Sequence, residues 1–308
     1  MSDTEVFIPF IQLRPSAVVL FTRYVGARKS RHDWESMYED NRPEELKAAD
    51  KKSRPLYSGT FTRSARKRML CALDCLILLS PARKIYNPIA QKTHTFQMSF
   101  ITLTYSCADI VDYKDSMRHL EQFLKWLTRT AGARLYVWRL EIQKRGQIHF
   151  HIVTEAFIRY DAIRDKWNSI QQKAGLIERG MNPNSTDIKS AISVSDVAAY
   201  VSKYMAKEDK EPTNYTGSEI KKFYGTSQNL QGAKRPTFDC TQTKGSLSEL
   251  QEMYRKLNYW EFNPSEYSTY VGRADDKKLL SPSRLAMRVL KIQKEFEEWK
   301  KDILPDLT

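Results

Sequence analysis

The chain has 308 residues, so it can bury a substantial core without disulfides or a structural metal. Its 50 Lys and Arg outnumber its 37 Asp and Glu, and the net charge of +13 favours an anionic partner such as nucleic acid. The four cysteines lack zinc-ribbon and secreted-disulfide spacing, and no secretory signal or bilayer-spanning apolar run is present. We therefore expect a cytoplasmic protein with reduced thiols and no membrane segment.

The first third of the chain predicts one clear helix. Residues 1–55 mix short apolar stretches with runs of charge, and we interpret them as a leader with some helix and no assigned role. Residues 62–79 turn from basic to apolar before Pro81, which predicts a helix with a buried second half. The basic half is a solvated face on the simplest interpretation, and Arg66 and Lys67 are its candidate contacts to nucleic-acid phosphate.

The middle of the chain predicts an α+β fold. The expected order is strand, helix, strand, strand, helix and strand, over residues 96–105, 115–131, 134–143, 147–154, 160–173 and 186–192. This order is the ferredoxin-like (RRM-like) split pattern, an antiparallel sheet with helices on one face.

The remaining residues predict loops and helices. A helix capped by Ser195 or Asp196 should run to about Lys207, and residues 210–245 have the composition of loops. Two peripheral helices are expected at residues 246–259 and 283–301. The predicted organisation is therefore a leader, a central domain and a mostly helical C-terminal extension, with boundaries at 1–55, 56–232 and 233–308.

A short hairpin should bring an acidic residue beside two histidines. Residues 144–146, Lys-Arg-Gly, form a three-residue connection with glycine last, which is a common hairpin loop. This loop pairs Gln143 with Gln147, so Glu141 falls opposite His149 on one face of the sheet.

His149 and His151 lie two apart on the same strand and therefore project from one side of the sheet. With Glu141 they form a donor set that suits Mg²⁺ or Mn²⁺ and leaves positions open for a phosphate oxygen. Glu155 lies on the same face and is a rival third ligand. Histidines on a strand are also often ordinary polar residues, so the pair alone leaves the metal site open.

Tyr200 and Tyr204 are four residues apart on one face of the following helix, and Lys203 and Lys207 each follow a tyrosine by three. Tyrosines on an amphipathic helix are also ordinary core residues. A phenol has a pKa of about 10 and attacks at neutral pH only beside a polarised phosphate or a base. A metal site in the same basic chain would meet that need, with Lys203 neutralising developing charge.

Three motifs in this order resemble the HUH endonucleases, in particular the two-tyrosine replication initiators of the phage gene A protein type. Phe100-Ile-Thr-Leu-Thr-Tyr105 is similar to the first-strand motif, His149-Phe-His151 to the histidine motif, and Tyr200-Val-Ser-Lys-Tyr204 to the tyrosine motif. Residues 222–230 look like a trailing motif of the phage-type initiators. The resemblance covers residues 62–232.

The resemblance implies rolling-circle initiation on a single-stranded origin or origin hairpin in the cytoplasm of a bacterial host. His149, His151 and Glu141 would hold the divalent metal, Tyr200 would attack first, and Tyr204 would serve alternate cleavage and joining. The product would be a 5′-phosphotyrosine and a 3′ hydroxyl for the host polymerase, with a host helicase as a further partner.

Four cations are the expected DNA contacts, namely Arg145, Lys207, Arg66 and Lys67. The chain has no G-x-x-x-x-G-K-[ST] loop, so no nucleotide cofactor is expected. Two alternatives remain at this point. One is a transposase or plasmid relaxase with the same chemistry, and the other is a nonenzymatic single-strand binder in which Tyr136, Trp138 and Phe150 stack on bases.

Overall fold

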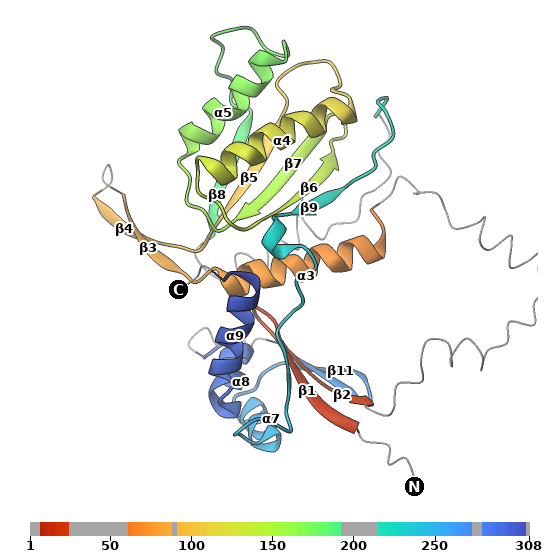
Figure 1. Cartoon of the computed structure of the whole chain (residues 1–308), viewed down its shortest axis with the longest axis vertical. Coiled ribbons are helices and arrows are strands. Elements are labelled where there is room, and N and C mark those ends of the chain that lie inside the picture. The colour runs from red at the N-terminus through yellow and green to blue at the C-terminus, as the bar shows by residue number, and fades with distance from the viewer. Residues whose placement is uncertain (1–6, 25–60, 88–90, 192–214, 273–278, 306–308) are drawn as a thin grey trace, which may run out of the picture.

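The computed structural model describes residues 7–24, 61–87, 91–191, 215–272 and 279–305 (Figure 1). These residues form six α-helices, two five-stranded antiparallel sheets and a separate two-stranded hairpin, so the α+β class is confirmed. Within these ranges, no helix has both the length and the apolar character needed to cross a membrane.

One sheet carries the two histidines, and we call it the histidine sheet. Its strand order is β8-β5-β7-β6-β9, and all its pairings are antiparallel. The ferredoxin-like order of elements is present as expected, with β9 (Tyr224–Thr226) added beside β6. The six elements are β5 (Met98–Thr104), α4 (Tyr113–Arg129), β6 (Tyr136–Ile142), β7 (Ile148–Thr154), α5 (Tyr160–Lys173) and β8 (Thr186–Ala191).

Helices α4 and α5 cover one face of the histidine sheet (Figure 1). Alternate strand residues such as Leu103 and Phe150 are apolar and fully buried in the same core as Phe123 and Trp167. The indole of Trp167 also donates a hydrogen bond to the backbone oxygen of Thr104, at 2.8 Å. Because successive side chains of a strand alternate, the histidines project from the opposite face.

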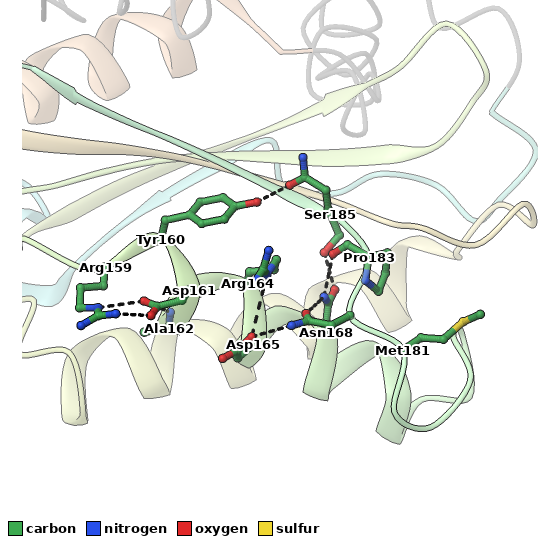
Figure 2. A network of polar contacts seen from close by, with 12 residues as sticks. Arg159, Tyr160, Asp161, Ala162, Arg164, Asp165, Asn168, Met181, Pro183 and Ser185 are labelled. Carbon is green, nitrogen blue, oxygen red and sulfur yellow. Dashed lines mark hydrogen bonds and ion pairs between the residues drawn. The ribbon is translucent and has the colours of Figure 1, made fainter. Parts of the chain in front are cut away.

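The connection from α5 to β8 is fixed by buried amide chemistry (Figure 2). The side chain of Asn168 donates to the side-chain oxygen of Asn182 at 2.6 Å and to the backbone oxygen of Pro183 at 2.8 Å. It also accepts from the hydroxyl of Ser185 at 2.5 Å. These bonds hold the start of β8 at the edge of the sheet, next to β5.

Helix α3 (Arg63–Leu79) lies between the two sheets (Figure 1) and confirms the helix expected at residues 62–79. Thr62 caps it by accepting from the backbone N–H of Ala65 at 3.2 Å. Its apolar half packs into the core of the histidine sheet. Asp74, on the same helix, accepts from Nε of Arg235 at 2.5 Å, so α3 is also tied to the strand leading to the second sheet.

The second sheet joins both ends of the chain, and we call it the terminal sheet. Its order is β10-β1-β2-β12-β11. Three helices contribute to the core on one side of it, namely α7 (Leu247–Lys256), α8 (Pro282–Leu290) and α9 (Gln293–Ile303). The strands are β1 (Phe7–Leu13), β2 (Val18–Tyr24), β10 (Thr237–Asp239), β11 (Glu261–Ser265) and β12 (Ser268–Val271).

The terminal sheet corrects the expectation for the start of the chain. Within the predicted leader, residues 7–24 form a β-hairpin, not helix, and Phe10 pairs with Asp239 across the sequence. The C-terminal region was expected to be mostly helical, but it also supplies three strands of this sheet. The physical reason is that each hairpin completes its hydrogen bonding and buries its apolar face only beside the other.

Three further elements differ from the sequence expectations. The region expected as loops contains β9, β10 and a short 3₁₀ helix (Gln228–Leu230). Strands β3 (Arg83–Asn87) and β4 (Lys92–Phe96) form a hairpin that the sequence did not reveal. The single helix expected at residues 283–301 is two helices, because Lys291 adopts the left-handed φ of 55° and ends α8.

Candidate metal and DNA-cleavage site

The predicted hairpin between β6 and β7 sets the register of the site. The backbone N–H of Gln143 donates to the oxygen of Gln147 at 2.9 Å, and that of Gly146 donates to the oxygen of Gln143 at 2.8 Å. Gly146 has a φ of 87°, which side chains rarely allow. Glu141 lies opposite His149, as expected from the three-residue loop.

The two histidines and the carboxylate come together on the face that α4 and α5 leave free. The ring centroids of His149 and His151 are 4.7 Å apart. Oε2 of Glu141 lies 2.9 Å from Nε2 of His151. His151 is buried and Glu141 is half-buried, so their contact is shielded from bulk water.

Two threonines of β5 orient the imidazoles. Thr102 and Thr104 pair with His151 and His149, and their hydroxyl oxygens lie 3.3 Å and 3.1 Å from the respective Nδ1 atoms. A hydroxyl both donates and accepts, so it supports either tautomer of its neighbouring ring. With the proton on Nδ1, the Nε2 lone pair is available to a metal ion. The sequence analysis placed both threonines in a motif but gave them no role.

Gln143 and Arg145 add a second support for His149. Nε of Arg145 donates to the side-chain oxygen of Gln143 at 3.1 Å, and the Gln143 nitrogen lies 2.9 Å from Nδ1 of His149. A guanidinium only donates, so the Gln143 amide turns its oxygen to Arg145 and donates to the ring. Arg145 also donates to the backbone oxygen of Tyr105 at 3.0 Å, so this candidate DNA contact is exposed but braced by the hairpin.

His149 is held as a neutral imidazole. Burial, with smaller contributions from the neighbouring His151 and Arg145, lowers its pKa to about 3, whereas Glu141 opposes the shift. Metal ions bind the neutral ring through a nitrogen lone pair. This environment therefore keeps His149 in the protonation state that a ligand needs at neutral pH.

The donor chemistry of this face fits a hard divalent ion. The separation of 2.9 Å between the Glu141 oxygen and the His151 nitrogen is close to the ~3 Å expected between adjacent ligands of an octahedral ion. His149 lies beside this pair as a further nitrogen donor. In the part of the chain that the structure describes, no three His, Cys, Asp or Glu side chains are close enough together to form a metal-holding group.

Glu155, the rival acidic ligand, is engaged elsewhere. Its carboxylate accepts from the backbone N–H groups of Arg134 and Leu135, at 2.7 Å and 3.1 Å, and from the hydroxyl of Thr154 at 3.0 Å. These bonds fix the start of β6 at the far end of the sheet. The structure thus brings Glu141 to a histidine, while Glu155 stabilises the connection between α4 and β6.

Two residues of the site face were missed by the sequence analysis. Arg139 is fully buried directly opposite His151, with its guanidinium 5.0 Å from the ring centroid of Phe61. Tyr224 of β9 pairs with Arg139, and its hydroxyl accepts from Nε of Arg68 at 3.4 Å. The available signal was strand alternation, because Arg139 precedes Glu141 by two residues. The trailing motif gave no hint that it would pair with β6.

The candidate DNA contacts on α3 are placed at the same border. Lys67 is exposed, whereas Arg66 is half-buried with its guanidinium 5.8 Å from the ring centroid of Phe61. The predicted nucleophiles Tyr200 and Tyr204, together with Lys203 and Lys207, lie outside the described residues.

The stacking platform considered for a nonenzymatic binder is not available on this sheet. Trp138 and Phe150 are 3% and 0% exposed and meet edge to face in the core. Gly225 lies against the same indole, since a Cβ there would come within 2.6 Å of the Trp138 nitrogen. Buried rings cannot stack on nucleic-acid bases, so this proposed base-binding platform is wrong.

A protein-family model matches part of the chain. Residues 98–209 match the family described as replication-associated protein ORF2, which is less than half of the chain. The match spans β5 to β8 with both histidines, and it extends over Tyr200 and Tyr204. It supports a replication-initiator family. No curated protein matches the chain.

Proposed function

We propose that this protein initiates rolling-circle replication by nicking and rejoining single-stranded origin DNA through a covalent tyrosine intermediate. The observation that carries the proposal is the meeting of His149, His151 and Glu141 on one sheet face. That face lies in the segment that matches replication-associated proteins. An anionic substrate also suits the net charge of +13.

We assign the metal ligands to His149, His151 and Glu141. Bound Mg²⁺ or Mn²⁺ supplies positive charge to the scissile phosphate. Thr102 and Thr104 hold the imidazoles in position, and the neutral state of His149 leaves a nitrogen lone pair for coordination. The buried contact between Glu141 and His151 preorganises the face before DNA arrives.

The covalent step is a transesterification by Tyr200. Its phenolic oxygen forms a bond to phosphorus as it loses its proton, and the bond from phosphorus to the 3′ oxygen breaks. The departing 3′ oxygen takes up a proton, and the 5′ phosphate stays on the tyrosine. One phosphodiester bond replaces another, so no ATP is consumed. Lys203 offsets charge on the phosphate, and Tyr204 repeats the reaction to rejoin the strand.

The 3′ hydroxyl released by this step is a primer end. A host helicase and DNA polymerase in the bacterial cytoplasm would extend it while the protein stays on the 5′ end. The polarity gives the proposal a strict signature, because only the fragment downstream of the nick becomes protein-linked.

An adduct assay tests the proposal. Single-stranded oligonucleotides tiled across the replicon that encodes the protein are incubated with Mn²⁺, each labelled at either its 3′ or its 5′ end. We expect one oligonucleotide to give a denaturation-resistant adduct that carries the 3′ label, and a shortened free fragment that carries the 5′ label. Tyr200→Phe should weaken the adduct, and the double change Tyr200→Phe/Tyr204→Phe should reduce it at least about 1,000-fold.

His149→Ala should abolish the adduct while retaining low-salt DNA binding, and His94→Ala is its matched control. His94 is an exposed histidine on the separate β3–β4 hairpin, so its loss should change neither property. An adduct that persists in the double tyrosine variant, or one that carries the 5′ label, contradicts the proposal. Equal losses in the His149 and His94 variants contradict the metal assignment.

A further inference from the structure

The terminal sheet has an uncovered face lined by flat rings. Helices α7, α8 and α9 pack on the side of Ile11, Val18 and Val271, so the alternate residues point the other way. Strand pairing sets Phe10 beside Phe21, and Tyr270 beside Phe262. We call the following set the aromatic face: Phe10, Phe21, Tyr270, Phe262 and Trp260.

The rings of the aromatic face are grouped, and two of them are largely open to solvent. Phe10 and Phe21 stack with centroids 5.7 Å apart, and Trp260 stacks on Phe262 at 6.1 Å with planes only 9° apart. Trp260 and Phe262 are 56% and 54% exposed. Clustered exposed rings are unfavourable in water, so their grouping points to a binding surface.

The chain also makes room for Trp260 on the sheet. A Cβ at position 272 would come within 2.8 Å of the Trp260 ring, and glycine leaves this space free. The edge of Trp260 then meets Tyr270 at a centroid distance of 5.8 Å and an angle of 76°. The indole therefore lies against the sheet and presents an outer surface to a ligand.

Arginines are interleaved with these rings. The guanidinium of Arg23 lies 5.0 Å from the centroid of Phe10 and 5.7 Å from that of Phe21. The guanidinium of Arg14 lies 5.5 Å from the centroid of Tyr270 and donates to the side-chain oxygen of Gln12. Positive charge held among flat rings suits a ligand that alternates anionic groups with planar ones.

We propose that the aromatic face binds single-stranded nucleic acid, with unpaired bases stacking on Trp260, Phe262 and Tyr270 and phosphates lying near Arg14 and Arg23. Single strands combine the two groups that this surface complements, whereas a duplex keeps its bases stacked on one another. The inference does not depend on the cleavage chemistry, because no residue of the aromatic face belongs to the histidine sheet.

Fluorescence anisotropy with a labelled oligothymidylate of about 20 nucleotides tests the inference on the full-length protein. The double variant Trp260→Ala/Phe262→Ala should weaken binding about 10-fold or more, because each lost stack contributes substantially to affinity. Trp260→Phe keeps a flat ring and should retain most of the binding. Tyr86→Ala is the matched control, since Tyr86 is 60% exposed on the β3–β4 hairpin, and it should bind as the unchanged protein does.

Three results would overturn the inference. The first is unchanged affinity in the double variant, and the second is an equal loss of affinity for duplex DNA. The third is a fall in thermal stability or in self-association without a change in affinity, which would assign the rings to packing within the chain or between copies. A normal adduct yield at saturating DNA in the double variant would support a binding surface separate from the cleavage site.

Discussion

The histidine sheet and the terminal sheet have the same general construction, five antiparallel strands with helices against one face. Their other faces differ. On the histidine sheet that face carries buried or half-buried polar groups, and each imidazole contacts a hydroxyl of β5. On the terminal sheet it carries exposed rings separated by arginines.

The difference shows how one architecture supports two kinds of chemistry. A metal site needs donors held within a few tenths of an ångström, and burial with complete hydrogen bonding provides that rigidity. Stacking on bases is tolerant of position because every base has a flat face. The precise site is therefore shielded beneath α3 and its neighbours, while the tolerant surface is open.

The most direct test of the histidine sheet compares its two candidate acidic ligands. Glu141→Gln should lower the rate of adduct formation by about 100-fold, at the upper end of losses seen when groups supporting a metal are removed. Glu155→Gln should leave the rate near that of the unchanged protein, since its amide oxygen still accepts from the backbone N–H groups of β6. Single-turnover kinetics with Mn²⁺ measure both. A greater loss from Glu155→Gln would reverse the assignment.

A pair of glycines compares the packing of the two sheets. Gly225→Ala should lower the free energy of unfolding by about 1–3 kcal/mol, because its Cβ meets the buried indole of Trp138. Gly272→Ala meets the exposed indole of Trp260, which can turn aside, so the change should stay within about 0.5 kcal/mol. Denaturant titrations measure both variants. Equal costs would mean that Trp260 is as firmly packed as Trp138.

The smallest effect near neutral pH is a pH dependence that belongs to the histidine sheet. The pKa of His149 is about 3 in the folded protein against an ordinary value of 6.5, so between these values the unfolded chain binds one proton more. Stability should therefore fall as the pH drops from about 6.5 towards 3, by less than about 1 kcal/mol between pH 7 and 6. His149→Asn should remove this contribution, and unfolding midpoints measured from neutral to acidic pH compare the two proteins. Parallel curves would contradict a buried neutral imidazole.

Local patterns predicted the histidine sheet well. Alternation placed His149 and His151 on one face, and the Lys-Arg-Gly loop fixed the pairing of Glu141 with His149. Both signals depend on residues that are close in sequence, where strand geometry leaves few choices. The roles of Thr102 and Thr104 were not predictable in the same way, because they depend on which strand lies beside β7.

The terminal sheet was not predicted because its partners are distant in sequence. The hairpin of β1 and β2 has ambiguous local character, and its hydrogen bonds are completed by β10 and β12 from the other end of the chain. Likewise, Glu155 shared a face with the histidines in the sequence pattern, but only the packed structure assigned it to backbone N–H groups.

Residue order alone was enough to establish the α+β class, the succession of elements in the histidine sheet and the residue types able to bind a metal, because these follow from periodicity and short loops. The contact of Glu141 with His151, the burial of Trp138 and the exposure of Trp260 emerged only in the folded chain. Those features depend on contacts between segments that local spacing does not specify, and the same aromatic residue type is buried in one sheet and exposed in the other for that reason.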